Sequence, residues 1–206
     1  MRVLALAALV CLMAAPSYGF EKLFAARCKE AGVPKAIAIA IAKQESALNP
    51  LCVNVAGEDF WPETKAEATR IIREAQTKSQ SFDVGLMQIN SQWIKRWGMD
   101  PVDLLSPDLN IRCGLRILKQ EFKRHGVNWR AIANYHSPDP ERGRRYAAMV
   151  YSRLRGGAEL RAMLSNPRLR ANLLLSRRYR NLKIGASADA SLLRQANSQR
   201  KPVGVN

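Results

Sequence analysis

The sequence predicts a mainly α-helical domain with little sheet. The clearest evidence lies in residues 108–125, where Ile111, Leu115, Leu118 and Phe122 recur at i, i+4, i+7 and i+11, the spacing of one helical face. Glycine and proline separate this segment from several others of helical length. The chain of 206 residues is 47% hydrophobic, which is enough to bury a core.

The first helices are bounded by residues that favour turns. Residues 20–31 are expected to form a helix that ends at Gly32, and Pro34 suits the start of the next one. That second helix covers residues 35–48 and ends before Pro50.

The middle of the chain contains the only expected departure from helix. Residues 53–61, around Gly57, predict a short hairpin or an ordered loop. Pro62 then opens a polar helix over about residues 63–78, and a further helix covers residues 89–97.

Three helices complete the domain. The amphipathic segment over residues 108–125 ends at Gly126, and residues 129–135 and 141–154 show helical patterns of their own.

The first 19 residues, Met1 to Gly19, have the properties of a secretory signal. Arg2 gives a positive start, and residues 3–15 form an apolar run too short to span a bilayer. Ser17 and Gly19 are small residues, so we expect cleavage before Phe20. The chain is therefore expected to be exported to the periplasm or cell envelope, with no transmembrane segment after cleavage.

The remaining chain divides into a domain over residues 20–155 and a basic extension over residues 156–206, which begins at Gly156-Gly157. The domain has 22 Lys/Arg against 15 Asp/Glu, and the extension, expected to be partly helical and partly disordered, has 10 against 2. Such charge attracts polyanions. Export argues against nucleic acid as the partner, whereas peptidoglycan carries peptide-stem carboxylates.

Signal cleavage leaves three cysteines, Cys28, Cys52 and Cys113, in a compartment that permits disulfides. The preferred pair is Cys28 with Cys113, because both lie within predicted core helices; the alternative is three small buried thiols. No Cys/His spacing resembles a metal site, and no Gly-rich phosphate loop follows a strand, so we expect no metal and no cofactor.

Glu45 is the first candidate for chemistry. It ends the apolar helix over residues 35–48 and shares a face with Ile41 and Ala38. Apolar neighbours desolvate a carboxyl group and raise its pKa, which keeps the acid able to donate a proton near neutral pH. An ordinary solvated glutamate at a helix end is the alternative for this residue taken alone.

A second segment follows about forty residues later, Asp83-Val84-Gly85-Leu86-Met87-Gln88-Ile89-Asn90. Its glycine would let backbone approach a ligand, and Gln88 and Asn90 supply side-chain donors.

Together these segments resemble a known family. The following residues occur in order: Gln44-Glu45-Ser46, then Asp83 to Asn90, then Pro107, Asn110-Ile111 and Gly114, then Ala133-Asn134-Tyr135-His136-Ser137. The sequence resembles the soluble-lytic type of lysozyme-like lytic transglycosylase, glycoside hydrolase family 23, over about residues 21–152. The Trp61-Pro62 insertion and the Tyr-His-Ser ending are similar to the small exported members associated with type III or type IV secretion or conjugation systems.

The resemblance implies a goose-lysozyme-like helical fold with a glycan cleft. It implies that Glu45 is the catalytic acid and that Ser46 supports the substrate beside it. It further implies that Gly85, Leu86, Met87 and Gln88 line the cleft and that Tyr135 faces the acid. His136 stands where the family often has Asn, and it is either a supporting residue or a structural histidine.

The family reaction cleaves the bond between N-acetylmuramic acid and N-acetylglucosamine and forms a 1,6-anhydro sugar. Ordinary glycosidases use two carboxyl groups, and here Glu45 is the one assured acid. Asp83 is expected to cap the following helix or accept backbone N–H groups. If it instead activated water, the protein would be a hydrolytic lysozyme. A non-catalytic wall-binding component of a secretion apparatus is a third alternative.

Overall fold

The computed structural model describes residues 17–154, and these residues are mostly helical, as predicted. In chain order the helices are α1 (Ser17–Ala31), α2 (Lys35–Ser46), α3 (Lys65–Thr77), α4 (Ser91–Trp97), η1, a 3-10 helix (Pro101–Leu105), α5 (Pro107–His125), α6 (Trp129–His136) and α7 (Pro140–Leu154). The strands are β1 (Val53–Val55), β2 (Glu58–Phe60), β3 (Phe82–Val84) and β4 (Ile89–Asn90). Most of the predicted signal segment and the basic extension lie outside the described residues.

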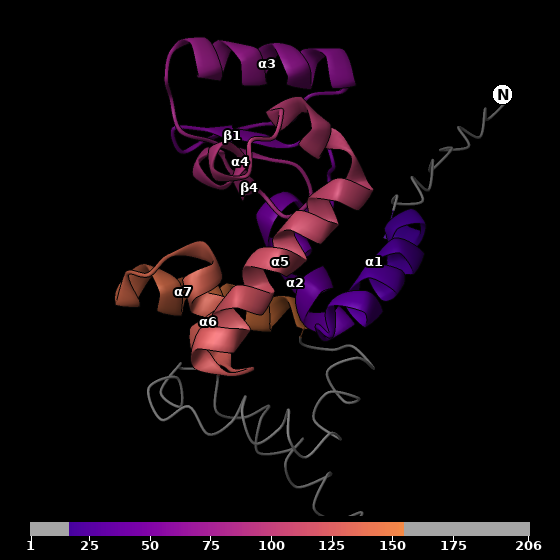
Figure 1. The fold of residues 1–206 in the computed structure, drawn as a ribbon, viewed down its shortest axis with the longest axis vertical. Helices are drawn as coiled ribbons and strands as arrows, with labels where there is room; N and C mark the ends of the chain where they lie inside the picture. Colours follow the sequence, from indigo (N-terminus) through magenta and orange to yellow (C-terminus); the bar gives the residue numbers. More distant parts are fainter. Residues whose placement is uncertain (1–16, 155–206) are drawn as a thin grey trace, which may run out of the picture.

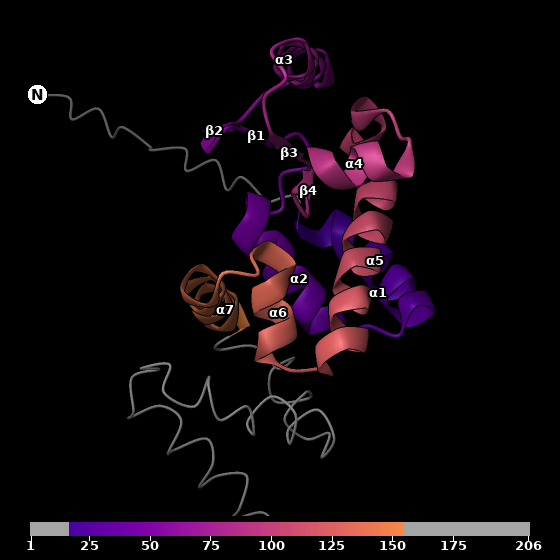
Figure 2. The same ribbon diagram turned by 60° about the vertical axis from the view of Figure 1, so that its left-hand side comes forward.

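The helix α2 forms the centre of the domain. Both views show it between α7 on one side and α1 on the other, and it contacts both of these helices (Figures 1 and 2). Its repeat of Ile and Ala is buried almost completely, with Ile37, Ala38, Ile41 and Ala42 all 0% exposed. The alanines are short enough to let neighbouring helices approach on several sides, so this helix is buried around most of its circumference.

The strands form one antiparallel sheet in the order β2-β1-β3-β4. Its first hairpin, β1 with β2, confirms the hairpin expected around Gly57. Helix α3 lies at the far end of the molecule, where it packs on β1 and η1 (Figure 1).

The second hairpin, β3 with β4, was not predicted. Residues 89 and 90 were expected to begin a helix, but Ile89 pairs with Val84 and Asn90 pairs with Asp83. The helix starts at Ser91, two residues later than expected, because the side chain of Asn90 accepts a hydrogen bond from the Gln92 N–H at 2.9 Å and caps α4.

The predicted disulfide between Cys28 and Cys113 is absent. Both residues, and Cys52, are buried free thiols. Burial raises the pKa of Cys28 to about 11 and that of Cys52 to about 12, so these groups pack as small protonated side chains. Membership of two packed helices does not ensure the short Cβ–Cβ separation and orientation that a disulfide requires.

Among residues 17–154, no helix combines the length and the apolar character needed to cross a membrane.

Candidate functional site

The carboxyl group of Glu45 lies in the last turn of α2, partly buried, where it accepts a hydrogen bond from the Tyr146 hydroxyl at 2.5 Å. Desolvation raises its pKa to about 8, against an ordinary value of 4.5. The Tyr146 hydrogen bond acts in the opposite direction, and the negative charges of Asp83 and Asp59 raise the pKa further. The apolar surroundings predicted for this acid are therefore found, and the group is mainly protonated at neutral pH.

Tyr146 was missed by the sequence analysis. It lies on α7, is 2% exposed, and its ring stacks on His136 with centroids 4.6 Å apart and planes 6° apart. Its position in the apolar face of α7 indicates a core tyrosine, and only the packing of α7 on α2 shows that its hydroxyl reaches Glu45. A tyrosine on the apolar face of a helix is expected to be buried, and a buried tyrosine hydroxyl needs a hydrogen-bond partner. This expectation is the only indication in the sequence that Tyr146 bonds another polar group.

His136 contacts this tyrosine by stacking. The residue is exposed at the end of α6, and partial desolvation together with the charge of Arg142 lowers its pKa. The stacking on Tyr146 is a contact that a supporting residue would make, and a role of His136 in the reaction stays a prediction.

The segment Gly85–Gln88 forms the tight turn between β3 and β4. Gly85 has φ +79°, and a Cβ atom there would overlap the Asn110 side-chain nitrogen, so the position requires glycine. Leu86 and Met87 are both 0% exposed. Their side chains therefore belong to the core, and a ligand would meet this turn through its backbone and through Gln88.

Asn110 holds the turn from α5. This fully buried amide accepts from the Met87 N–H at 2.8 Å and donates to the carbonyls of Val84 at 2.8 Å and Leu104 at 2.9 Å. Gly114, one helical turn further on, faces Met87 so closely that a Cβ atom would overlap the Met87 sulfur. Asn110 and Gly114 belong to the motif found in the sequence, but only the tertiary packing shows that they hold the turn in place, and we refer to this pair as the clamp.

Two other predicted site residues also hold the turn. The Tyr135 hydroxyl donates to the Met87 carbonyl at 2.8 Å, and the Ser46 hydroxyl donates to the Leu86 carbonyl at 2.9 Å. Ser46 is 0% exposed and positions the turn through this bond, and its direct support of a substrate stays a prediction. Desolvation raises the pKa of Tyr135, and the nearby charge of Glu45 raises it further. The tyrosine that forms a hydrogen bond with Glu45 is Tyr146, not Tyr135.

Gln88 is the member of the turn with a partly exposed side chain. Its amide nitrogen donates to the carbonyls of Gly85 at 2.8 Å and Cys52 at 3.1 Å. The amide is thereby fixed in orientation.

The expected helix-capping role of Asp83 is wrong. Asp83 lies in β3, seven residues before Asn90, and its carboxylate accepts from the Asn90 side chain at 2.9 Å. Burial raises the pKa of Asp83, the Asn90 hydrogen bond lowers it, and Asp59 raises it. Asn90 is thus occupied with Asp83 and with its own helix cap, and it is a structural residue in this arrangement.

Trp61 is the exposed tryptophan of the domain, at 53%, in the loop that follows β2. It is therefore the tryptophan most accessible to a sugar ring. Among residues 17–154, no group of three or more His, Cys, Asp or Glu side chains could hold a metal ion.

The fold and site together define a helical domain with a protonated carboxyl group, that of Glu45, beside a rigid backbone turn. Residues 22–144 match the family described as Transglycosylase SLT domain, which is 123 of the 206 residues, and the chain belongs to this family. Its fold is therefore lysozyme-like, as the resemblance implied.

Three relatives illustrate the range of similarity. Protein virB1 of Agrobacterium fabrum (strain C58) is 34% identical over 101 residues, which are 48% of this chain and 41% of that protein. Invasion protein IagB of Salmonella typhi is 30% identical over 138 residues, 63% of this chain and 73% of that protein. A peptidoglycan-binding-like protein of Escherichia coli O157:H7 is 38% identical over 89 residues, 38% of this chain and 53% of that protein.

The chain spans about half or less of the length of several curated relatives that it matches. No solved structure gives a significant match.

Asn110→Ala should destabilise the domain by about 3 kcal/mol or more, because it leaves the buried N–H of Met87 and two buried carbonyls without their partner. Urea unfolding followed by circular dichroism would measure the loss. The control is Asn54→Ala, which removes an amide whose bonds to Asp59 and Gly57 are exposed and should cost about 1 kcal/mol or less. Equal losses for the two variants would contradict the clamp.

Proposed function

We propose that this chain is an exported peptidoglycan lytic transglycosylase with Glu45 as its catalytic acid. The observation that carries the proposal is the carboxyl of Glu45, whose pKa is raised to about 8 by burial in a domain of the SLT family. A carboxylic acid that stays protonated at neutral pH can donate a proton to a leaving group.

In the proposed reaction, Glu45 protonates the glycosidic oxygen between N-acetylmuramic acid and N-acetylglucosamine. The bond to the anomeric carbon breaks, and the substrate's N-acetyl group stabilises the resulting cationic sugar. The Glu45 carboxylate then takes the proton from the 6-hydroxyl as that oxygen attacks the anomeric carbon. The product is 1,6-anhydro-N-acetylmuramic acid, the carboxyl group is protonated again, and no water is consumed.

Tyr146 fits the second half of this cycle. Its hydroxyl donates to Glu45 Oε1, a hydrogen bond that favours the ionised carboxylate and so opposes desolvation. The two effects keep the pKa within reach of both protonation states, which a group that acts first as acid and then as base requires.

The proposed biological setting is local opening of the cell wall for a secretion or conjugation apparatus. The resemblance to small exported transglycosylases supports it, and one relative is described as an invasion protein. The predicted signal segment supports export to the periplasm or cell envelope.

A second candidate is hydrolysis, as in lysozyme proper. The charge of Asp83 is near enough to raise the pKa of Glu45, so a second carboxyl group does belong to the same region. Its hydrogen bond to the Asn90 side chain favours a structural role, because that bond already occupies the carboxylate.

A third candidate is a wall-binding protein without catalysis, since one relative is described as peptidoglycan-binding-like. The raised pKa of Glu45 and its bond to Tyr146 favour catalysis, because glycan binding alone needs neither.

Glu45→Gln should reduce cleavage of purified sacculi by roughly 10²–10⁴-fold, because the amide keeps the shape of the side chain and removes the transferable proton. Release of soluble muropeptides would measure the loss, and residual activity within tenfold of wild type would place the acid elsewhere.

The same variant should not be less stable, which separates a catalytic loss from a folding defect. The pKa of Glu45 is raised in the folded state, so the wild type loses stability as pH rises from about 4.5 to about 8. Gln cannot ionise, so the melting temperature of the variant should equal that of wild type at low pH and exceed it at pH 8.

Mass spectrometry of the released disaccharide-peptides should show products one water lighter than hydrolytic muropeptides, because the 6-hydroxyl replaces water as the nucleophile. Asp83→Asn serves as the control: it should leave the anhydro product unchanged and cost less activity than Glu45→Gln. Products dominated by reducing-end muramic acid, lost on Asp83→Asn, would establish the hydrolytic alternative.

Tyr146→Phe should lower activity by on the order of tenfold, because it removes a hydrogen bond that stabilises the Glu45 carboxylate formed when the acid has given up its proton. The high-pH limb of activity should also move to higher pH, since the lost bond favoured ionised Glu45 and the pKa rises without it. The control is Tyr135→Phe, which removes the bond to the Met87 carbonyl and should lower thermal stability without moving that limb upward. An unshifted limb in Tyr146→Phe would show that the tyrosine does not tune the acid.

A further inference from the structure

A concave surface lies between the end of α1 and one face of α5, apart from Glu45. It is an open groove of about 710 Å³. In both views α1 and α7 lie on opposite sides of α2, so α2 stands between the helix α1 that borders this groove and the helix that carries Tyr146 (Figures 1 and 2). Its residues are Arg27, Glu30, Ala31, Gly32, Arg112, Leu115, Arg116, Lys119, Gln120, Phe122, Lys123 and Val127.

One rim of the groove is a row of cations on α5. Arg112, Arg116, Lys119 and Lys123 stand at i, i+4, i+7 and i+11, so they share one helical face over about 16 Å of axis. All four side chains are exposed. Within residues 17–154, no carboxylate forms an ion pair with Arg116, Lys119 or Lys123.

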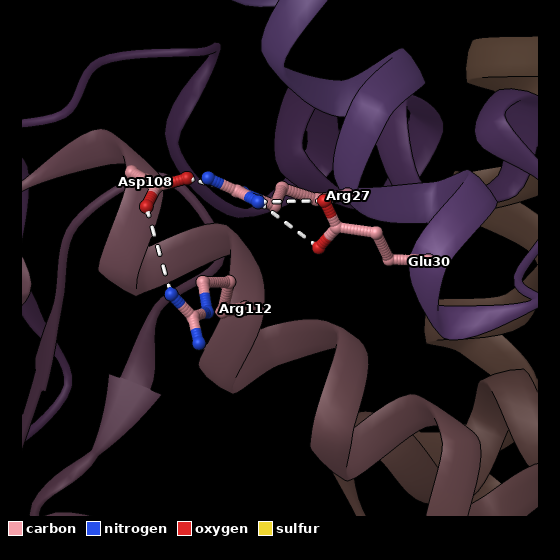
Figure 3. A network of polar contacts seen from close by, with 4 residues as sticks. All are labelled: Arg27, Glu30, Asp108 and Arg112. Carbon is pink, nitrogen blue, oxygen red and sulfur yellow. Dashed lines mark hydrogen bonds and ion pairs between the residues drawn. The ribbon is translucent and has the colours of Figure 1, made fainter.

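The acidic groups of the groove are gathered at its other rim and at one end. Arg27 binds Glu30 at 2.7 Å and Asp108 at 2.6 Å, and Arg112 approaches the same Asp108 at 4.0 Å (Figure 3). The carboxylates of Glu30 and Asp108 are therefore neutralised by Arg27 and Arg112. The excess positive charge lies along α5, where Arg116 stacks 4.8 Å above the Trp97 ring and is held in place.

The floor of the groove is partly apolar. Ala31, Phe122 and Val127 are partly exposed there, and Leu115 is buried beneath them. A ligand that combines carboxylates with small apolar side chains would match both the rim and the floor.

Charge limits which ligand this can be. The chain's own extension, residues 156–206, has 10 Lys/Arg against 2 Asp/Glu, and a second copy of the chain has a net charge of +16. Both would be repelled by the row of cations. An external polyanion remains, and peptidoglycan is the polyanion on which the proposed function already acts.

We propose that the groove between α1 and α5 binds the carboxylate-bearing stem peptides of peptidoglycan, as a second attachment point away from Glu45. The inference rests on the proposed function for its choice of polymer. Stem peptides combine free carboxylates with alanine methyl groups, which suits the cationic rim and the apolar floor. Two attachment points on one domain hold a network more tightly than binding near Glu45 alone, because the second contact forms at high effective concentration.

The test measures sacculus binding by co-sedimentation in a Glu45→Gln background, so that the polymer is not digested. The groove variant carries Arg116→Gln, Lys119→Gln and Lys123→Gln. The matched control carries Lys65→Gln, Lys78→Gln and Lys95→Gln, which removes the same charge from exposed positions on and around α3 and α4. Each protein is also tested on glycan strands from which an amidase has removed the peptides.

The groove variant should bind intact sacculi about tenfold more weakly than the control at low salt, because three attractive contacts are lost. The two proteins should bind stripped strands equally, and the difference on sacculi should vanish near 1 M salt. Equal binding of the two proteins to intact sacculi would overturn the proposal. A deficit that persists on stripped strands would also overturn it, since the groove would then bind glycan.

Further measurements distinguish stem-peptide binding from membrane binding and from a folding defect. If the groove variant loses binding to phosphatidylglycerol vesicles while its sacculus binding is intact, the surface faces a membrane and the proposal fails. The single variant Lys119→Glu repeats the test if the triple variant melts below the control. With Glu45 restored, the groove variant should cleave short soluble glycan fragments at the wild-type rate, so failure of the groove is distinguishable from failure of the catalytic proposal.

Discussion

The hydrogen bonds that fix the turn Gly85–Gln88 are the constraint on which the candidate site depends. A turn packed inside a protein must satisfy its backbone polar groups without water, and here side chains from three helices do so. Asn110 of α5 binds the Met87 N–H, Tyr135 of α6 binds the Met87 carbonyl, and Ser46 of α2 binds the Leu86 carbonyl. Because Ser46 follows Glu45 directly, the same bond that satisfies the turn also fixes the position of the acid relative to it.

The acid itself is set by two opposing effects. Burial of α2 between α1 and α7 desolvates Glu45 and raises its pKa, whereas the Tyr146 hydroxyl stabilises the ionised form. Helix α7 contributes to both, because it covers the end of α2 and also carries the tyrosine. A change in the packing of α7 would therefore alter both the desolvation of Glu45 and its hydrogen bond to Tyr146. The pKa of the acid thus depends on how α7 packs against the core.

The sequence was sufficient to predict what depends on local pattern. The face shared by Ala38, Ile41 and Glu45 follows from helical spacing alone. The raised pKa of the acid was one of two interpretations that this spacing left open, because desolvation depends on tertiary packing. The strands β3 and β4 could not be predicted in this way, because three and two residues are too few for alternation to be recognised. Tyr146 could not be assigned either, since 101 residues separate it from Glu45 and only tertiary packing brings them together.

The distribution of charge explains how a basic protein can keep its acid protonated. A cation beside Glu45 would stabilise the carboxylate and lower its pKa, which would remove the proton that the proposed reaction needs. The charges that act on Glu45 are instead those of Asp83 and Asp59, and they raise its pKa. The row of cations on α5 lines the groove beside the end of α1, and α1 and α7 lie on opposite sides of α2. The proposed attraction to an anionic polymer and the protonation of the acid therefore depend on different parts of the domain, so strengthening the first should not weaken the second.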